Sequence, residues 1–301
     1  MREYTFVVSK EDEGVGIRRM LRRNFHFSSR LLTRLRAQKS VYLNGQVLEG
    51  WMKPKEGDVI RAVLPEEASH FPEEDIPIEV LHEDEDLLIL NKQAGVTVHP
   101  TKGHASHTIA NGLMKYMRET DQQFKIRFVN RLDMDTSGIL IVGKNSHAQD
   151  DLVRQMHGGG MEKSYIALVH GIIEQEEFTI DRPIGRPTPD SVTRCVLPEG
   201  QGRPSVTRVR VLERYDSGYT QVLLRLETGR THQIRVHMSW LGHPVAGDSL
   251  YGGDAPELIE RQALHAWRIR FLHPVSRQPA EVTAPLPGDM TRAIEKARRI
   301  R

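Results

Sequence analysis

The chain has 301 residues, of which 38% are hydrophobic and 27% charged, so it can form more than one globular domain with a substantial core. A single cysteine, Cys195, excludes an internal disulfide and fits a reducing cytoplasm. No apolar run approaches the roughly 18 residues that a membrane-spanning helix needs, and residues 1–14 lack the apolar core of a signal peptide. We therefore expect a cytoplasmic protein that does not enter a membrane.

Charge is unevenly distributed along the chain, although the formal net charge is only +2. Residues 1–64 hold 13 Lys/Arg against 7 Asp/Glu, whereas residues 65–86 hold 10 Asp/Glu and no Lys/Arg. The rest of the chain is basic again. Two basic blocks separated by an acidic strip suggest two bodies, each facing a polyanion such as a nucleic acid. Charge alone does not decide this, because solvation of two ordinary surfaces explains the same pattern.

The N-terminal block is predicted to contain two helices. Residues 14–40 carry eight Lys/Arg and no acid. Apolar side chains recur there at helical intervals, namely at Ile17, Met20, Leu21, Leu31, Leu32 and Leu35. Asn24 is expected to interrupt the first helix, and Ser28 or Ser29 to cap the second.

A hairpin and a linker are predicted to follow. Asn44-Gly45 lies between two short β-type runs and indicates a tight hairpin turn, and residues 58–64 form a further strand. Residues 65–77 are acidic, contain three prolines and lack apolar periodicity, so they are predicted to be a linker. We expect one domain over residues 1–64 and another over 78–301.

The second body alternates strand-like and helical runs. Strands are expected within residues 78–92 (two, around an acidic turn), 137–144, 163–173 and 206–228 (a hairpin turned at 216–218). Helices are expected over 146–156, closed by the glycines at 158–160, and over 231–242, with Thr231 as N-cap. Neighbouring strands joined by hairpins, with helices between them, predict the α+β class with a largely antiparallel mixed sheet.

Motifs that would imply a cofactor or a metal are missing. The sequence has neither a G-x-x-x-x-G-K-[ST] phosphate loop nor a G-x-G-x-x-G dinucleotide fingerprint. His157 and the three glycines after it have the letters of a lipase oxyanion loop, but no G-x-S-x-G elbow accompanies them. His99, His104 and His107 share a segment without a Cys or Glu partner, which disfavours a zinc site. We expect no metal and no cofactor.

The run NRLDMDTSG, residues 130–138, directly precedes an apolar strand. It places Asp133, a second acid and an arginine in a turn whose backbone amides can hold a carboxylate. Such a carboxylate can serve as a nucleophile or a base. The same letters also describe an ordinary capped turn, so this run alone does not establish catalysis.

Two later runs add groups suited to a nucleic-acid base. Lys163 and Tyr165 open a strand and share a face, which suits stacking on a base and holding its phosphate. The run GRTHQIRVH, residues 229–237, begins a helix on which His232 and Arg235 share one face and Gln233 and His237 another. An arginine on such a helix could pair with a buried aspartate and keep it ionised.

At NRLDMDTSG, KSY and GRTHQIRVH, in this order, the sequence resembles the RluA-type family of pseudouridine synthases. The flanking runs DLLILNKQAGVTVHP, LGHPVAGDSLYG and LHAWRIRFLHPV agree, so the resemblance covers about residues 76–287. The two basic helices and hairpin within residues 12–64 resemble the S-four-type RNA-binding domain, a common partner of this catalytic domain.

The resemblance implies roles for individual residues. Asp133 matches the catalytic aspartate, Tyr165 the tyrosine that stacks on the target base, and Arg235 the arginine that pairs with the aspartate. Arg131 matches the arginine that fills the gap left by a flipped base. Further RNA-binding residues are expected to be Lys163, Arg230, His232, Gln233, Arg18, Arg22 and Arg34. Asn130 departs from the family's usual histidine, and it cannot carry positive charge.

We therefore expect an RNA pseudouridine synthase, a monomer that acts on structured RNA. Large-subunit ribosomal RNA is favoured as substrate and transfer RNA is an alternative. Asp133 would act as nucleophile on the sugar or as base. Two rival hypotheses are a binding-only RNA protein, such as a ribosome-assembly factor, and a glycosylase or other hydrolase that releases free uracil.

Overall fold

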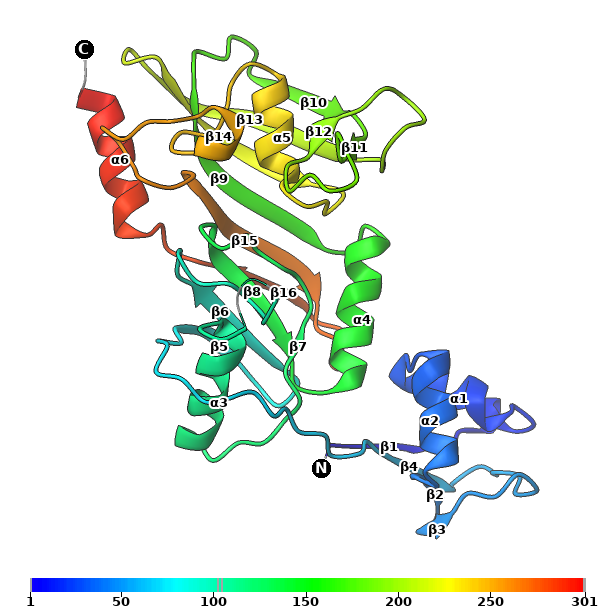
Figure 1. Ribbon diagram of the computed structural model, residues 1–301. Coiled ribbons are helices and arrows are strands. Elements are labelled where there is room, and N and C mark those ends of the chain that lie inside the picture. Colours follow the sequence, from blue (N-terminus) through cyan, green and yellow to red (C-terminus); the bar gives the residue numbers. More distant parts are fainter. Residues whose placement is uncertain (1, 102, 104, 300–301) are drawn as a thin grey trace.

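The computed structural model describes residues 2–101, 103 and 105–299, which form two bodies (Figure 1). The smaller, N-terminal body contains a four-stranded antiparallel sheet with the strand order β1-β4-β2-β3. Its strands are β1 (Glu3–Val7), β2 (Val41–Leu43), β3 (Gln46–Val47) and β4 (Val59–Val63). A short 3-10 helix, η1 (Lys10–Asp12), precedes two α-helices, α1 (Ile17–Phe25) and α2 (Ser29–Ala37).

The predicted helix pair and hairpin are confirmed, with one difference at Asn24. This residue lies within the last turn of α1, where its side-chain amide donates to the Met20 carbonyl, and the helix ends one residue later. Ser28 caps α2 by accepting a hydrogen bond from the Leu31 amide. Asn44 and Gly45 both have positive φ, as a two-residue hairpin turn requires.

The larger body is built on a ten-stranded mixed sheet, with the main strand order β10-β13-β14-β9-β15-β8-β6-β5. Its strands are β5 (Val80–Glu83), β6 (Leu87–Lys92), β7 (Arg127–Phe128), β8 (Ser137–Gly143), β9 (Glu162–His170), β10 (Glu177–Asp181), β13 (Val206–Tyr215), β14 (Tyr219–Leu226), β15 (Leu264–Leu272) and β16 (Pro279–Thr283). Among the described strands, β8 and β15 form the parallel pair, and the other neighbours are antiparallel. A separate two-stranded sheet consists of β11 (Ile184–Gly185) and β12 (Cys195–Val196).

Helices cover this sheet and carry part of its core (Figure 1). They are α3 (Ile109–Glu119), α4 (Ser146–His157), α5 (Gln233–Trp240), the 3-10 helix η2 (Ser249–Tyr251) and α6 (Gly288–Arg299). One continuous apolar core joins the central strands to buried faces of α3, α4, α5 and α6. A second apolar core lies between the N-terminal sheet and its two helices. The expected α+β class with a largely antiparallel mixed sheet is therefore confirmed.

Two features differ from expectation. The helix predicted from Thr231 begins at Gln233, and its N-cap is His232 with a left-handed φ of 58° and no side-chain cap, so the predicted Thr cap is wrong. The Gln233 side chain instead turns back and accepts the Arg230 amide hydrogen. Strand β1, with the sequence EYTFV, was not predicted; it pairs with β4 and completes the N-terminal sheet.

The acidic segment 65–77 has no helix or strand, but it is packed against both bodies. Ile76 is buried in the larger core, and the Asn111 side chain donates to the Pro72 carbonyl. Glu67 pairs with Arg127 of the larger body and with Arg34 of α2. The segment therefore anchors one body to the other. Within the described residues, no helix is long and apolar enough to span a membrane.

Candidate active site

The turn before β8 presents Asp133 beside α5. The Asp133 side chain is 22% exposed, and its Oδ2 accepts a hydrogen bond from Arg235 Nη1 at 3.1 Å. Arg235 also binds Asp248 through two bonds, Nε to Oδ2 at 2.6 Å and Nη2 to Oδ1 at 2.8 Å. Asp248 is almost fully buried, so its bidentate bond fixes the guanidinium plane and aims the remaining donor at Asp133. Burial lowers the pKa of Arg235, but the two carboxylates outweigh it and raise that pKa above its usual value.

His232 lies on the other side of the Asp133 carboxylate. Its Nε2 is 3.9 Å from Asp133 Oδ1, and its Nδ1 is 2.8 Å from the Tyr251 hydroxyl. That hydroxyl accepts the Arg194 amide hydrogen, so its own proton can be donated to His232 Nδ1. Burial lowers the pKa of His232 below its usual value; the Asp133 charge opposes this shift, whereas Arg235 and Arg194 add to it. At neutral pH the imidazole is therefore neutral and points its Nε2 hydrogen at Asp133.

Tyr165 faces the same carboxylate from strand β9. Its ring is 8% exposed, and burial together with the nearby Asp133 charge raises the pKa of its hydroxyl. A tyrosine held neutral in an apolar wall offers a flat face to a nucleobase. Lys163, two residues earlier on β9, is also buried, and burial with the neighbouring Arg230 lowers its pKa to about 8. Lys163 and Arg230 together can bind an anionic group beside Tyr165.

Two buried cations hold the backbone of the Asp133 turn. Lys92 Nζ donates to the carbonyls of Gln93, Met134 and Thr136, at 2.8, 2.7 and 3.0 Å. Three acceptors match the three hydrogens of an ammonium group. Burial nevertheless lowers the pKa of Lys92 to about 7. The charges of Asp135 and Asp133 oppose this shift and favour the ammonium form, which ties β6 to the turn.

Arg261 holds the turn from the opposite side. Its Nη1 donates to the Asp135 carbonyl at 2.9 Å and to the Gln262 carbonyl at 3.0 Å, and Nη2 approaches Ser137 Oγ at 3.4 Å. The Asp289 carboxylate, in the first turn of α6, binds Arg261 Nε at 2.6 Å and Nη2 at 3.0 Å. All five guanidinium hydrogens are thereby used, and the C-terminal helix is linked to the turn.

Asn130, the departure from the family pattern, joins the turn to β8. Its side-chain amide donates to the Ile139 carbonyl at 3.0 Å, and its Oδ1 accepts the Ile141 amide hydrogen at 2.8 Å. The side chain thus makes the two hydrogen bonds to β8 that the backbone of a neighbouring strand would otherwise make. Gly138 lies beside it with φ of 107°, and a Cβ there would be 2.2 Å from the Ala266 carbonyl oxygen of β15. The turn can approach β15 because residue 138 is glycine.

The structure brings some predicted site residues together and separates others. Asp133, Tyr165, Arg235 and His232 surround one point, with Lys163 and Arg230 close to one another beside it. Gln233 is 2% exposed and hydrogen-bonds Thr207, Thr228 and the Val206 carbonyl, so it faces the interior rather than RNA.

The predicted RNA-binding arginines differ in their accessibility. Arg131 is exposed next to the Asp133 turn. On the N-terminal body, Arg18 and Arg22 are exposed and contact only the hydroxyls of Thr33 and Ser29 among the described side chains. Arg34 instead binds Glu67 and Ser146 between the bodies, so its guanidinium is engaged within the chain.

The histidines considered for zinc are not assembled in the described part of the chain. His99 contacts the Pro100 carbonyl and His107 pairs with Glu74, while His104 lies outside the described residues. A different group, Asp84, Asp86 and His273, has ligand atoms within 4.8 Å of one another. Arg2 and Asn145 already bind the Asp86 carboxylate, so we assign no metal there.

Comparison with known proteins shows to which family the chain belongs. Residues 86–240, which include the Asp133 turn, β9 and α5, match the family model described as RNA pseudouridylate synthase. The chain belongs to the RNA pseudouridine synthase family. Its members are RNA isomerases, and the expected enzyme class is thereby confirmed.

Relatives match over most of the chain. An uncharacterized RNA pseudouridine synthase of Bacillus subtilis, YjbO, is 42% identical over 89% of this chain and 94% of its own length. Ribosomal large subunit pseudouridine synthase D of Escherichia coli is 38% identical over 86% of this chain and 82% of its own length. The solved human RNA Pseudouridylate Synthase Domain Containing 1 superposes with a TM-score of 0.56 at 30% identity, over 77% of this chain and 98% of that one.

Proposed function

We propose that this synthase isomerises specific uridines in structured RNA, with large-subunit ribosomal RNA as the favoured substrate. Two observations support this substrate. Relatives named ribosomal large subunit pseudouridine synthase D match most of the chain at 36–38% identity. A basic N-terminal body, suited to the RNA backbone, is packed against the synthase body.

In the proposed reaction, Asp133 acts on the sugar of the target uridine, as nucleophile or as base. One observation supports this role. Buried Asp248 binds Nε and Nη2 of Arg235 and so fixes the plane of its guanidinium group, and Nη1 of the same group donates a hydrogen bond to the Asp133 carboxylate. The target base is first turned out of its stack, at a cost of a few kcal/mol. Tyr165 would receive it and Arg131 would fill the vacated space.

The N1–C1′ glycosidic bond breaks, and the freed uracil rotates and is rejoined to C1′ through its carbon five, which loses its hydrogen as a proton. The half-buried setting of Asp133 supports this step, because a released base must stay trapped while it turns. Neutral His232 would steady the carboxylate, and Lys163 with Arg230 would hold the phosphate next to the target. Gln233 would support α5, because its side chain is buried and hydrogen-bonds Thr207 and Thr228.

We further propose residues 1–64 as an S-four-like RNA-binding domain, 65–77 as an acidic linker and 78–301 as the catalytic domain. Exposed Arg18 and Arg22 on α1 would contact the RNA backbone, whereas Arg34 would orient the two bodies. The enzyme would work as a monomer in the cytoplasm, where ribosomal RNA is found.

The first experiment measures tritium release from uridine labelled at carbon five, with RNA from a strain that lacks this gene. We expect release by the parent protein and none by Asp133→Ala, with RNA binding of the variant retained. Ribosomal and transfer RNA are assayed separately, and release from transfer RNA alone would refute the favoured substrate. Free uracil among the products would indicate a glycosylase, and RNA binding without release would indicate a binding-only protein.

A further inference from the structure

A cavity of about 320 Å³ opens between the two bodies, and we call it the seam pocket. It is lined by Arg22 and His26 from the end of α1, Asp151, Arg154 and Gln155 from α4, Gly158 and Gly160 after α4, and Arg277. Arg154 bridges the bodies, because its Nη2 donates both to the His26 carbonyl at 3.0 Å and to Asp151 at 2.6 Å.

The seam pocket has an excess of positive charge. Three guanidinium groups line it, and the one carboxylate among the lining residues, Asp151, is buried and already bound by Arg154, Gln155 and Arg277. Arg22 has no carboxylate partner in the described part of the chain, and its Nη2 donates to the Ser29 hydroxyl. Two positive charges therefore remain without compensation on an open surface.

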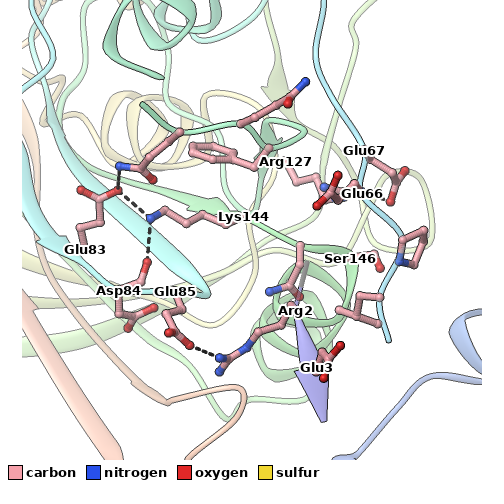
Figure 2. Close-up of a pocket in the computed structure, with 16 residues that line it drawn as sticks. Arg2, Glu3, Glu66, Glu67, Glu83, Asp84, Glu85, Arg127, Lys144 and Ser146 are labelled. Atoms are coloured by element: carbon pink, nitrogen blue, oxygen red, sulfur yellow. Dashed lines mark hydrogen bonds and ion pairs between the residues drawn. The ribbon is translucent and has the colours of Figure 1, made fainter. Parts of the chain in front are cut away.

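A second, larger opening between the bodies has the opposite character (Figure 2). Its acidic lining residues are Glu3, Glu66, Glu67, Glu83, Asp84 and Glu85. Arg2, Arg127 and Lys144 also line it, but each is paired with a carboxylate, as Figure 2 shows for Arg2 with Glu85 and Lys144 with Glu83. A polyanion is thus repelled at this opening and attracted at the seam pocket.

We propose that the seam pocket binds a backbone phosphate of the substrate RNA and sets the register between the N-terminal body and the active site. This inference rests on the proposed function. Arginine is suited to phosphate because its planar donors match two phosphate oxygens, and the seam pocket offers arginines from both bodies.

Strand β15 relates the seam pocket to the active site. His265, near its start, pairs with Ser137 after the Asp133 turn. Leu272, at its end, exchanges two hydrogen bonds with the side chain of Gln155, which lines the seam pocket. The seven residue steps from His265 to Leu272 span about 23 Å of strand, so β15 connects the support of the Asp133 turn to the seam pocket.

Gly160 allows the charge of the seam pocket to be changed without breaking an ion pair. Its φ is not in the left-handed region, and an added Cβ would meet its nearest neighbour, Gln155 Cβ, at an ordinary 3.6 Å. Gly160→Glu therefore places a carboxylate in the pocket, and Gly160→Gln is the neutral control of the same size. Thermal unfolding of both variants checks that the fold is kept.

The probe is total RNA from the strain that lacks this gene, titrated by filter binding at several KCl concentrations. We expect Gly160→Glu to raise Kd and KM about tenfold, to leave kcat unchanged, and to lower the slope of log K against log salt by about one. Gly160→Gln should behave like the parent. Equal effects of the two variants, or an unaltered salt slope for Gly160→Glu, would overturn the phosphate site. Absence of tritium release by the parent itself would instead overturn the proposed function.

Discussion

Replacing Asp248 by asparagine tests whether its buried ion pair with Arg235 aims the Asp133 carboxylate. The substitution keeps the shape of the side chain but removes the charge that receives two bonds from Arg235, at 2.6 and 2.8 Å. One of the two arginine donors would then face an NH₂ group, which cannot accept it. Because both side chains are at most 8% exposed, we expect Asp248→Asn to lower the free energy of unfolding by about 3–5 kcal/mol.

The same substitution should reduce catalysis under conditions in which the variant is still folded. Arg235 freed from Asp248 no longer presents one fixed donor to Asp133, so we expect kcat for tritium release to fall at least tenfold, or about 1.4 kcal/mol. Urea unfolding followed by tryptophan fluorescence measures the loss, because Trp240 lies on α5 and Trp267 on β15. Exposed Asp254→Asn is the matched control, with an expected change within about 0.5 kcal/mol. A stability loss below about 1 kcal/mol together with parental kcat would show that the pair does not aim Asp133.

Two further predictions concern the support of the same turn, and a third concerns His147, which is buried on α4. Gly138→Ala should destabilise the protein by about 3–5 kcal/mol in urea unfolding, because its Cβ would meet the Ala266 backbone at 2.2 Å and its φ is 107°. Asp289→Asn should lower kcat several-fold with little change in KM, since it weakens the hold of Arg261 on the turn; an equal change in KM would contradict this. Burial lowers the pKa of His147 to about 4, so the unfolded chain binds its proton first as pH falls. Stability should therefore drop by about 2 kcal/mol between pH 7 and pH 5, and His147→Phe should remove that part of the loss.

The glycine prediction has an internal control. Gly95 also has a left-handed φ, of 83°, but no atom lies within 4 Å of an added Cβ. Gly95→Ala should cost only the backbone strain, about 1–2 kcal/mol. Equal losses for the two variants would mean that contact with β15 is unimportant.

Local patterns in the sequence predicted local structure well. Apolar spacing and the Ser28 cap predicted the two N-terminal helices, and Asn44-Gly45 predicted the hairpin, because each depends on neighbours a few residues apart. Strand β1 was missed, since its partner β4 lies more than 50 residues away. The start of α5 was misplaced because His232 adopts a left-handed conformation, which propensity does not favour.

For the site, the sequence suggested candidate residues but not what holds them. Lys92 and Asp248 both lie in runs that carry the family resemblance, yet nothing in their spacing shows that one binds the Asp133 turn and the other Arg235. Arg34 and Gln233 were expected to bind RNA from the family and domain resemblance together with charge and spacing. Their burial and partners arise from tertiary packing, which a linear pattern does not contain.

The parallel pairing of β8 with β15 determines when, during synthesis of the chain, the Asp133 turn can be completed. Ser137 and His265, which this pairing brings into contact, are 128 positions apart in the chain. At a synthesis rate of about 5–20 residues per second, the ribosome makes the aspartate turn roughly 6 to 26 seconds before the strand that supports it. During that interval the nascent chain contains Asp133 but not strand β15, which supports the Asp133 turn. The Asp133 turn can therefore be completed only after strand β15 has been synthesised.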